Sequence, residues 1–373
     1  MALRALAGIN LAAIERNVAR LRGGLTGGAE LCAVVKGDGY GHGSAAAARA
    51  ALAGGASWLA VASAQEAAEL RAGGIVSPVL VMGAVSAQEL AVALAARADV
   101  VAWSESFVAD LTEAASDPVR VHVKLDTGMG RLGTRDTSEA LRVAERVIEA
   151  GPSLQLVGAM THFASADEDS EFLARQLASF RPFAAELRRR RPGILVHAAN
   201  SAATLREPKS HFDMVRCGIA IYGCDPMNED PARHGLEPAL ELTSYLAAVK
   251  LARTGDSVGY GRRFVAEHDT WIATLPIGYA DGIRRALTNN CEVLVGGLRH
   301  QLVGTVSMDN VTIDLGPQTD FRPGEKATII GRDGPEVQTA EDLAKRIGTI
   351  SYEILCGVSA RVPRSYHRDG ESA

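Results

Sequence analysis

The chain has 373 residues, of which 47% are hydrophobic and 22% are charged, and its formal net charge is −5 at pH 7. This length suits two domains, or one large barrel with an appendage, and the hydrophobic content is enough for a sizeable core. The charge argues against nucleic acid as a partner, and the one basic run, Arg188–Arg191, is interpreted as a solvated helix end.

The five cysteines, at positions 32, 217, 224, 291 and 356, form no C-x-x-C pair. We therefore predict a reduced compartment, no disulfide framework and no zinc or other metal site. No apolar run near the N-terminus has the length of a signal peptide, and none in the chain reaches the roughly 18 residues of a membrane span. A cytoplasmic protein with no membrane partner is expected.

After a first helix capped by Asn10, short apolar segments alternate with helical patterns over the first 220 residues. Strands that are buried on both faces and alternate with helices are typical of a parallel sheet. Eight such segments predict a (β/α)8 TIM barrel, with an open doubly wound sheet as the alternative. The segments are 31–36, 57–62, 78–83, 99–103, 120–126, 154–160, 194–200 and 212–219.

The pattern changes at residues 224–241, where prolines and acidic residues indicate a linker. Beyond it, alternating apolar runs separated by turn residues predict a compact antiparallel β domain. One late helix is expected at 339–348, with a threonine cap and a glycine stop. We therefore predict a barrel domain over residues 1–235 and a C-terminal mainly-β domain over residues 236–373.

Lys36 is the last residue of the first predicted barrel strand, in the segment AVVKGDGYGHGS. Active groups of barrels cluster at the carboxyl ends of the strands. A lysine at that place is partly desolvated, which lowers its pKa and makes its amine a usable nucleophile. The alternative is a lysine that only extends its head group to solvent.

Polar residues also follow the later strands. They are Lys124 and Arg131, around a glycine turn; His162; His197, Asn200 and Ser201; and Arg216, Gly218 and Ile219. Ser201 and the amides of Gly218 and Ile219 suit a phosphate, because barrels often bind phosphate after strands seven and eight. Taken singly, His197 is equally consistent with a buried hydrogen-bonding residue of the core, and Asn200 with a turn.

Together these segments resemble alanine racemase, a family of pyridoxal 5′-phosphate (PLP) enzymes, over nearly the whole chain. The matching segments are VVKGDGYGHG, KLDTGMGRLG, THFASAD, NSAAT, RCGIAIYG, VGYGRRF, PIGYADG, SMDN and SYEILCGVSARVPR. The family usually has alanine at Gly37 and Gly39, an aromatic residue at Cys217 and often a cysteine at Ser307. We expect a looser loop around Lys36, and none of these departures removes a functional group.

The resemblance implies that Lys36 forms a Schiff base with PLP. It further implies that the phosphate is held by Tyr40, Ser201, Gly218, Ile219 and Tyr352. Arg216 would face the pyridine nitrogen, His197 would brace Arg216, and His162 would contact the cofactor near its ring oxygen. Because an arginine stays charged, it disfavours a proton on that nitrogen, and we infer that this favours clean proton return over transamination.

Racemisation removes a proton from one face of Cα and returns one to the other, so two groups are needed. The resemblance implies Lys36 for the D-isomer and Tyr260 for the L-isomer. A tyrosine needs cationic neighbours for this role, because an isolated phenol ionises only at about pH 10. Since Lys36 and Tyr260 belong to different domains, the family arrangement implies a head-to-tail homodimer with shared active sites.

For the substrate, the resemblance implies that Arg131, aided by the Met308 backbone, binds the carboxylate. Many family members carry a carbamylated lysine at the position of Lys124, which would attract Arg131; a plain lysine is the alternative. Tyr279 and Tyr352 are expected to narrow the entrance.

The implied function is interconversion of L-alanine and D-alanine, which supplies D-alanine for peptidoglycan. The alternatives are a broad-spectrum alanine/serine racemase and a PLP-binding regulatory barrel without turnover. The second alternative is disfavoured because such proteins usually lack the β domain.

Overall fold

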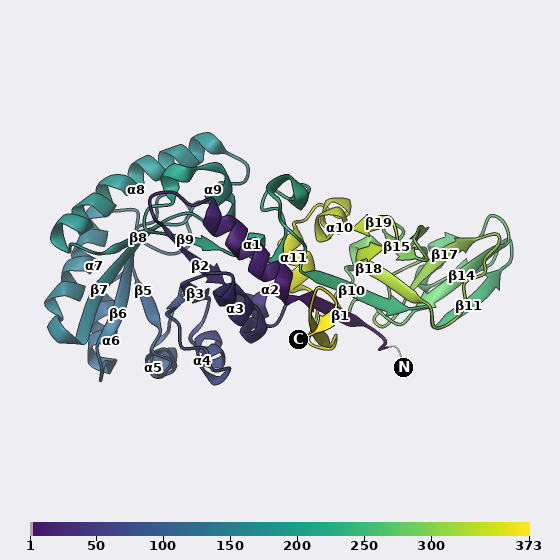
Figure 1. The fold of residues 1–373 in the computed structure, drawn as a ribbon, viewed down its shortest axis with the longest axis horizontal. Coiled ribbons are helices and arrows are strands. Elements are labelled where there is room, and N and C mark those ends of the chain that lie inside the picture. The colour runs from purple at the N-terminus through teal and green to yellow at the C-terminus, as the bar shows by residue number, and fades with distance from the viewer. Residues whose placement is uncertain (1–2) are drawn as a thin grey trace.

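The computed structural model describes residues 3–373 and shows a barrel and a β-rich unit side by side along the longest axis of the molecule (Figure 1). Eight strands close the barrel in chain order, β2 to β9. They are β2 Glu30–Val34, β3 Trp58–Val61, β4 Val79–Val81, β5 Asp99–Ala102, β6 Val119–Lys124, β7 Leu154–Met160, β8 Leu195–His197 and β9 Met214–Cys217. The predicted barrel is confirmed.

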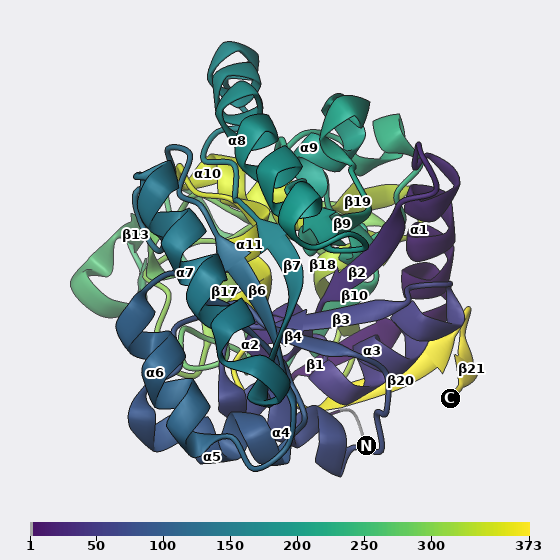
Figure 2. The ribbon, with the colours of Figure 1, turned by 90° about the vertical axis from the view of Figure 1, so that its left-hand side faces the viewer.

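All neighbouring barrel strands pair in parallel, and β2 pairs with β9 to close the ring, with Cys32 opposite Arg216. The closure shows that the alternative of an open sheet is wrong. Most strand residues are buried because side chains fill the barrel and helices cover its outside, as Figure 2 shows for α4 to α8. The carboxyl ends of the eight strands therefore meet at one mouth.

The helices of this unit begin at conventional caps. Asn10 accepts hydrogen bonds from the backbone of the first turn of α1, as the sequence predicts, and Ser63 forms a capping box with Glu66 at the start of α4. The helices are α1 Leu11–Gly23, α2 Lys36–Tyr40, α3 Ser44–Ala53, α4 Ala64–Ala72, α5 Ala87–Ala95, α6 Glu105–Ala114, α7 Thr137–Glu149, α8 Ser170–Arg190 and α9 Ser201–Arg206. Within residues 3–373, no helix has both the length and the apolar character needed to cross a bilayer.

The second unit is mainly β, as predicted, and is built on a sheet of order β16-β15-β18-β10-β1-β20-β21, with β19 beside β18. A second sheet, β11-β14-β17, and the β12–β13 hairpin complete it. The strands are β1 Leu6–Asn10, β10 Leu240–Tyr245, β11 Ala248–Ala252, β12 Ser257–Val258, β13 Phe264–Val265, β14 Thr270–Leu275, β15 Glu292–Val295, β16 Leu298–Gln301, β17 Val311–Gly316, β18 Lys326–Asp333, β19 Glu336–Gln338, β20 Arg364–Arg368 and β21 Glu371–Ser372.

Strand β1 places the N-terminal part of the chain beside β20, near the C-terminus. It precedes the barrel in sequence, but it lies in the β-rich unit, antiparallel to β10 and parallel to β20. The division of the chain between residues 235 and 236 stays a prediction.

Two helices of the second unit lie near the barrel: α10 Ala340–Arg346 and α11 Ser351–Cys356. Thr339 caps α10, which confirms the predicted late helix. Arg364 donates hydrogen bonds to the backbone oxygens of Val358 and Gly41, and so joins the end of the chain to the turn that follows Lys36. The second unit thus supports the mouth of the barrel.

Candidate active site

Strand β2 ends at Val34, so Lys36 is the first residue of α2 and not, as predicted, the last residue of the strand. Lys36 lines a pocket of about 170 Å³ at the barrel mouth, together with Lys124, Arg131 and His162. Burial, reinforced by the charge of Arg131, lowers the pKa of Lys36 below its usual range. A larger share of its amine is therefore neutral near physiological pH, and only the neutral amine is a nucleophile or a base.

The turn after Lys36 is left-handed. Four consecutive residues, Gly37 to Tyr40, have φ between +52° and +62°. The turn is fixed by hydrogen bonds from the Gly37 amide to the Glu66 carboxylate (2.6 Å) and from the Gly39 amide to the Val35 carbonyl (3.0 Å). This conformation costs an L-residue about 1–2 kcal/mol, so glycine at positions 37 and 39 removes strain from a well-defined turn.

The residues predicted to hold a phosphate lie together. Ser201 Oγ accepts hydrogen bonds from the backbone amides of Gly218 (3.0 Å) and Ala220 (3.4 Å). A Cβ atom at Gly218 would lie 2.3 Å from the Tyr40 hydroxyl, so the absence of a side chain there lets that hydroxyl approach the loop. The rings of Tyr40 and Tyr352 are 6.0 Å apart. Hydroxyl and amide groups therefore meet in one cradle suited to an anion.

Arg216 is buried on β9 and makes its hydrogen bonds to uncharged partners. It donates to the carbonyls of Thr161 (2.8 Å) and Ala198 (3.0 Å) and to Nδ1 of His197 (2.8 Å). Its Nε is buried without a protein partner in the described structure. Burial lowers the pKa of Arg216 to about 10, so the side chain remains a cation at neutral pH.

Lys124 ends β6 and is 3% exposed. Burial, together with the charges of Arg216 and Arg131, lowers the pKa of Lys124 to about 8. Asp126 accepts hydrogen bonds from the amides of Gly128 and Gly130, and the resulting turn returns Arg131 to the pocket that Lys124 lines. Burial, reinforced by the charges of the same two arginines, lowers the pKa of His162 well below its usual range.

Tyr260, Tyr279 and Met308 lie elsewhere, on the β-rich unit, and are 75%, 44% and 51% exposed. The Thr305 hydroxyl donates to the Tyr260 carbonyl (2.6 Å), and the Tyr279 amide donates to the Ser307 carbonyl (2.9 Å). The segment 305–308 thus connects all three residues. Among the residues that the structure describes, the lining of the Lys36 pocket includes none of these three.

Sequence reasoning did not assign a role to His122 or Glu66. Glu66 holds the amide of Gly37, as described above, and His122 hydrogen-bonds to His197 inside the barrel (2.9 Å). A signal for His122 was present, because His122 and Lys124 are two residues apart on one strand and therefore share a face. Glu66 gave no such signal, because a glutamate at the third position of a helix is fully explained by its role in the capping box of α4.

A closed barrel with a desolvated lysine at its mouth, an anion cradle beside it and a β-rich second unit defines a class of lysine-dependent barrel enzymes. Residues 9–226 match the model for the N-terminal domain of alanine racemase, and residues 239–366 match the model for its C-terminal domain. The chain belongs to the alanine racemase family.

Individual alanine racemases are similar to this chain over almost its full length. Alanine racemase 1 of Bacillus subtilis (strain 168) is 42% identical over 369 residues, which is 97% of this chain and 92% of the relative. The structure of alanine racemase from Bacillus anthracis with bound L-Ala-P is 37% identical, with a TM-score of 0.92 over 100% of this chain and 97% of that one. Alanine racemase of Streptomyces coelicolor A3(2) is 39% identical, with a TM-score of 0.91 over 97% of each chain.

Proposed function

We propose that this protein is a PLP-dependent racemase that interconverts L-alanine and D-alanine. The observation that carries the proposal is the place of Lys36: a half-buried amine of lowered pKa at the barrel mouth, beside Arg131 and Lys124, in a member of the alanine racemase family. A desolvated lysine amine suits both covalent attachment to a carbonyl and proton transfer.

The residues present fit PLP. The cradle of Tyr40, Ser201 and Gly218 offers hydroxyl and amide groups to a phosphate, and a side chain at position 218 would fill it. The buried, unpartnered Nε of Arg216 is a donor for the pyridine nitrogen. We assign Ile219 and Tyr352 to the phosphate and His162 to the ring, as the resemblance implies.

When bound, PLP withdraws electrons from Cα of the attached amino acid and so makes its proton removable. Arg131 and the Met308 backbone bind the substrate carboxylate and fix the orientation of Cα. Lys36 takes and returns the proton on one face of Cα, and Tyr260 does so on the other. Tyr279 and Tyr352 restrict the entrance.

The exposed position of Tyr260 supports a head-to-tail homodimer. A tyrosine that is 75% exposed and absent from the lining of the Lys36 pocket acts there only if a second chain supplies it. We propose that each subunit contributes its barrel to one site and the face of Tyr260, Tyr279 and Met308 to the other.

We also propose that Lys124 is carbamylated. A pKa of about 8 leaves a substantial fraction of its amine neutral at physiological pH, and this form adds to carbon dioxide with release of a proton. The carbamate carries a negative charge and attracts Arg131, where the ammonium form would repel it. His197 supports the same site by accepting a hydrogen bond from Arg216.

The proposed product, D-alanine, assigns the protein to the supply of peptidoglycan precursors in the cytoplasm. Racemisation rates for a panel of L-amino acids with added PLP test the function directly. We expect alanine to react fastest and serine far more slowly. No turnover of alanine would contradict the proposal, and equal rates would favour the broad-spectrum alternative.

A further inference from the structure

A chain of buried polar side chains crosses the interior of the barrel. From Arg216 on β9, hydrogen bonds lead to Nδ1 of His197 on β8 (2.8 Å), from Nε2 of His197 to Nδ1 of His122 on β6 (2.9 Å), and from Nε2 of His122 to Asp99 on β5 (3.1 Å). Both histidines are fully buried, and Asp99 is 3% exposed. This hydrogen-bond chain extends from the amino end of β5 toward the mouth of the barrel.

The end groups determine where each proton lies. A guanidinium only donates, so Nδ1 of His197 must accept, and the single proton of this neutral ring lies on Nε2. That proton faces Nδ1 of His122, which must therefore accept as well. The remaining proton of His122 lies on Nε2 and is donated to Asp99. Both imidazole dipoles then point their negative ends toward Arg216 and their positive ends toward Asp99.

The absence of a side chain at Gly158 makes this hydrogen-bond chain possible. Strand β7 lies between β6 and β8, and its residue Gly158 is paired with His122. A Cβ atom at position 158 would lie 1.8 Å from Nδ1 of His122. Gly158 is not among the residues with positive φ, so its backbone does not require glycine. The glycine leaves the space through which the His122 ring passes β7 to reach His197.

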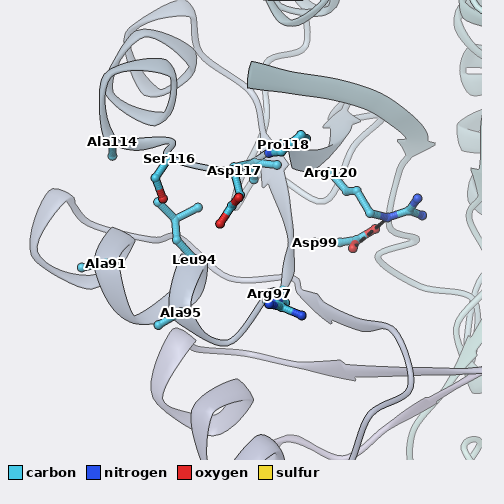
Figure 3. Close-up of a pocket in the computed structure, with 12 residues that line it drawn as sticks. Ala91, Leu94, Ala95, Arg97, Asp99, Ala114, Ser116, Asp117, Pro118 and Arg120 are labelled. Atoms are coloured by element: carbon cyan, nitrogen blue, oxygen red, sulfur yellow. Dashed lines mark hydrogen bonds and ion pairs between the residues drawn. The ribbon is translucent and has the colours of Figure 1, made fainter. Parts of the chain in front are cut away.

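Asp99 is held at the opposite end of the barrel from the Lys36 pocket. Its carboxylate accepts two hydrogen bonds from Nε of Arg120, at 3.0 Å and 3.1 Å, and both residues line a cavity of about 760 Å³. Figure 3 shows this pair among the lining residues. The Arg120 guanidinium also lies 5.6 Å from the centre of the Trp58 ring, and that ring meets His122 edge-on. The carboxylate is thus fixed from outside while it accepts from His122 inside.

This hydrogen-bond chain stabilises the Arg216 guanidinium. A buried cation without a carboxylate partner is otherwise costly in free energy. Its direct partners are carbonyl oxygens and histidine rings, so carbonyl and imidazole dipoles supply the partial negative charge that faces it. Asp99, whose own charge is paired with Arg120, fixes the direction of the two imidazole dipoles. We propose that Asp99 and His122 are positioning residues that act through His197 to hold the Arg216 guanidinium, charged and in a fixed orientation, against the cofactor ring. This inference rests on the proposed function, in which Arg216 faces the pyridine nitrogen.

The first test needs no cofactor and no activity. Nitrogen-15 NMR of histidine-labelled protein at pH 8 should show His122 and His197 as neutral rings with the proton on Nε2. In Gly158→Ala, the added methyl group should displace His122 and shift the resonances of both rings. A proton on Nδ1 of either ring, or a charged ring, would overturn the proposal. Unchanged spectra in Gly158→Ala would do the same.

The second test measures function in the PLP-loaded enzyme. We expect Asp99→Asn and His122→Gln to lower kcat about tenfold, with KM changed less than about twofold, and to raise the fraction of turnovers that end in transamination. The matched control is His211→Gln. His211 is a buried histidine outside this hydrogen-bond chain that bonds to the Thr204 carbonyl, and its replacement should leave kcat, KM and the transamination fraction near wild type.

If the Asp99 and His122 variants behave like His211→Gln, the positioning role is wrong. A wild-type protein that binds no PLP or does not racemise alanine instead contradicts the proposed function, and the NMR result distinguishes the two failures.

Discussion

The predicted site residues form two groups that differ in solvent exposure: one group lies at the barrel mouth, and the other lies on the exposed face of the β-rich unit. At the mouth, burial lowers the pKa values of Lys36, Lys124 and Arg216. Arg216 is also held by hydrogen bonds. On the other face, Tyr260 and Met308 are more than half exposed. The barrel half of the proposed site is therefore organised within one chain, and in the proposed homodimer the exposed half is covered by a second copy.

The largest effect is expected from removing the amine at the mouth. Lys36→Ala should lower racemisation by about 10³-fold or more, because it removes both the attachment point and one base. The visible absorbance of lysine-bound PLP should vanish as well. An unchanged absorption spectrum would contradict the attachment of PLP to Lys36.

Tyr260→Phe should remove the base on the opposite face and lower turnover by about 10²-fold. Exchange of the α-proton with deuterated solvent should still occur from D-alanine, through Lys36, and should fall much further from L-alanine. Mass spectrometry of the recovered alanine measures both exchanges. An equal loss of exchange from the two isomers would contradict the assignment of one base to each face.

The third prediction concerns carbamylation of the Lys124 amine at the mouth of the barrel. Carbon-13 NMR after addition of labelled bicarbonate should show a carbamate resonance that is absent in Lys124→Met. Because the pKa of Lys124 is lowered to about 8, the reactive neutral amine increases as the pH rises through 8, well below the range of an exposed lysine. At a fixed concentration of dissolved carbon dioxide, the carbamate should therefore form faster at pH 8 than at pH 6. An identical spectrum in Lys124→Met would exclude carbamylation at this residue.

The smallest effect concerns the left-handed turn. Gly37→Ala should lower the free energy of unfolding by about 1 kcal/mol, because its φ of +62° is strained for alanine while the nearest atom to the added Cβ is 4.0 Å away. Gly39→Ala should cost more, since its Cβ would also lie 3.3 Å from Ala47 and Ser44. Urea denaturation measures both variants. Equal stabilities of the two variants and the wild type would show that these glycines do not relieve strain.

Strand patterns and strand-end residues were enough to predict the barrel and the gathering of Lys36, Lys124 and His162 at its mouth, because parallel strands of a barrel share one carboxyl edge. The rule for the loops after strands seven and eight predicted that Ser201 and Gly218 lie together, whereas only the resemblance added Tyr40 and Tyr352 to the proposed phosphate cradle. The expected loose loop at Gly37 and Gly39 did not anticipate a hydrogen-bonded left-handed turn, because handedness depends on tertiary contacts such as the bond from Gly37 to Glu66.

The resemblance predicted the contact between His197 and Arg216, but the continuation of this hydrogen-bond chain through His122 to Asp99 was not predicted. It requires contact between β6 and β8 past a third strand, and the space for that contact depends on the absent side chain of Gly158. Likewise, hydropathy alone did not place β1, at the start of the chain, between β10 and β20.

The most direct test of a site shared between two chains is activity in a mixed dimer of Lys36→Ala and Tyr260→Phe subunits. Such a dimer has one site with both defects and one with neither. After random exchange in a 1:1 mixture, about half of the dimers are mixed, so we predict about one quarter of the wild-type activity, from two parents that are almost inactive. Activity no higher than that of the parents, in a dimer shown by mass spectrometry to contain both subunits, would contradict the shared site.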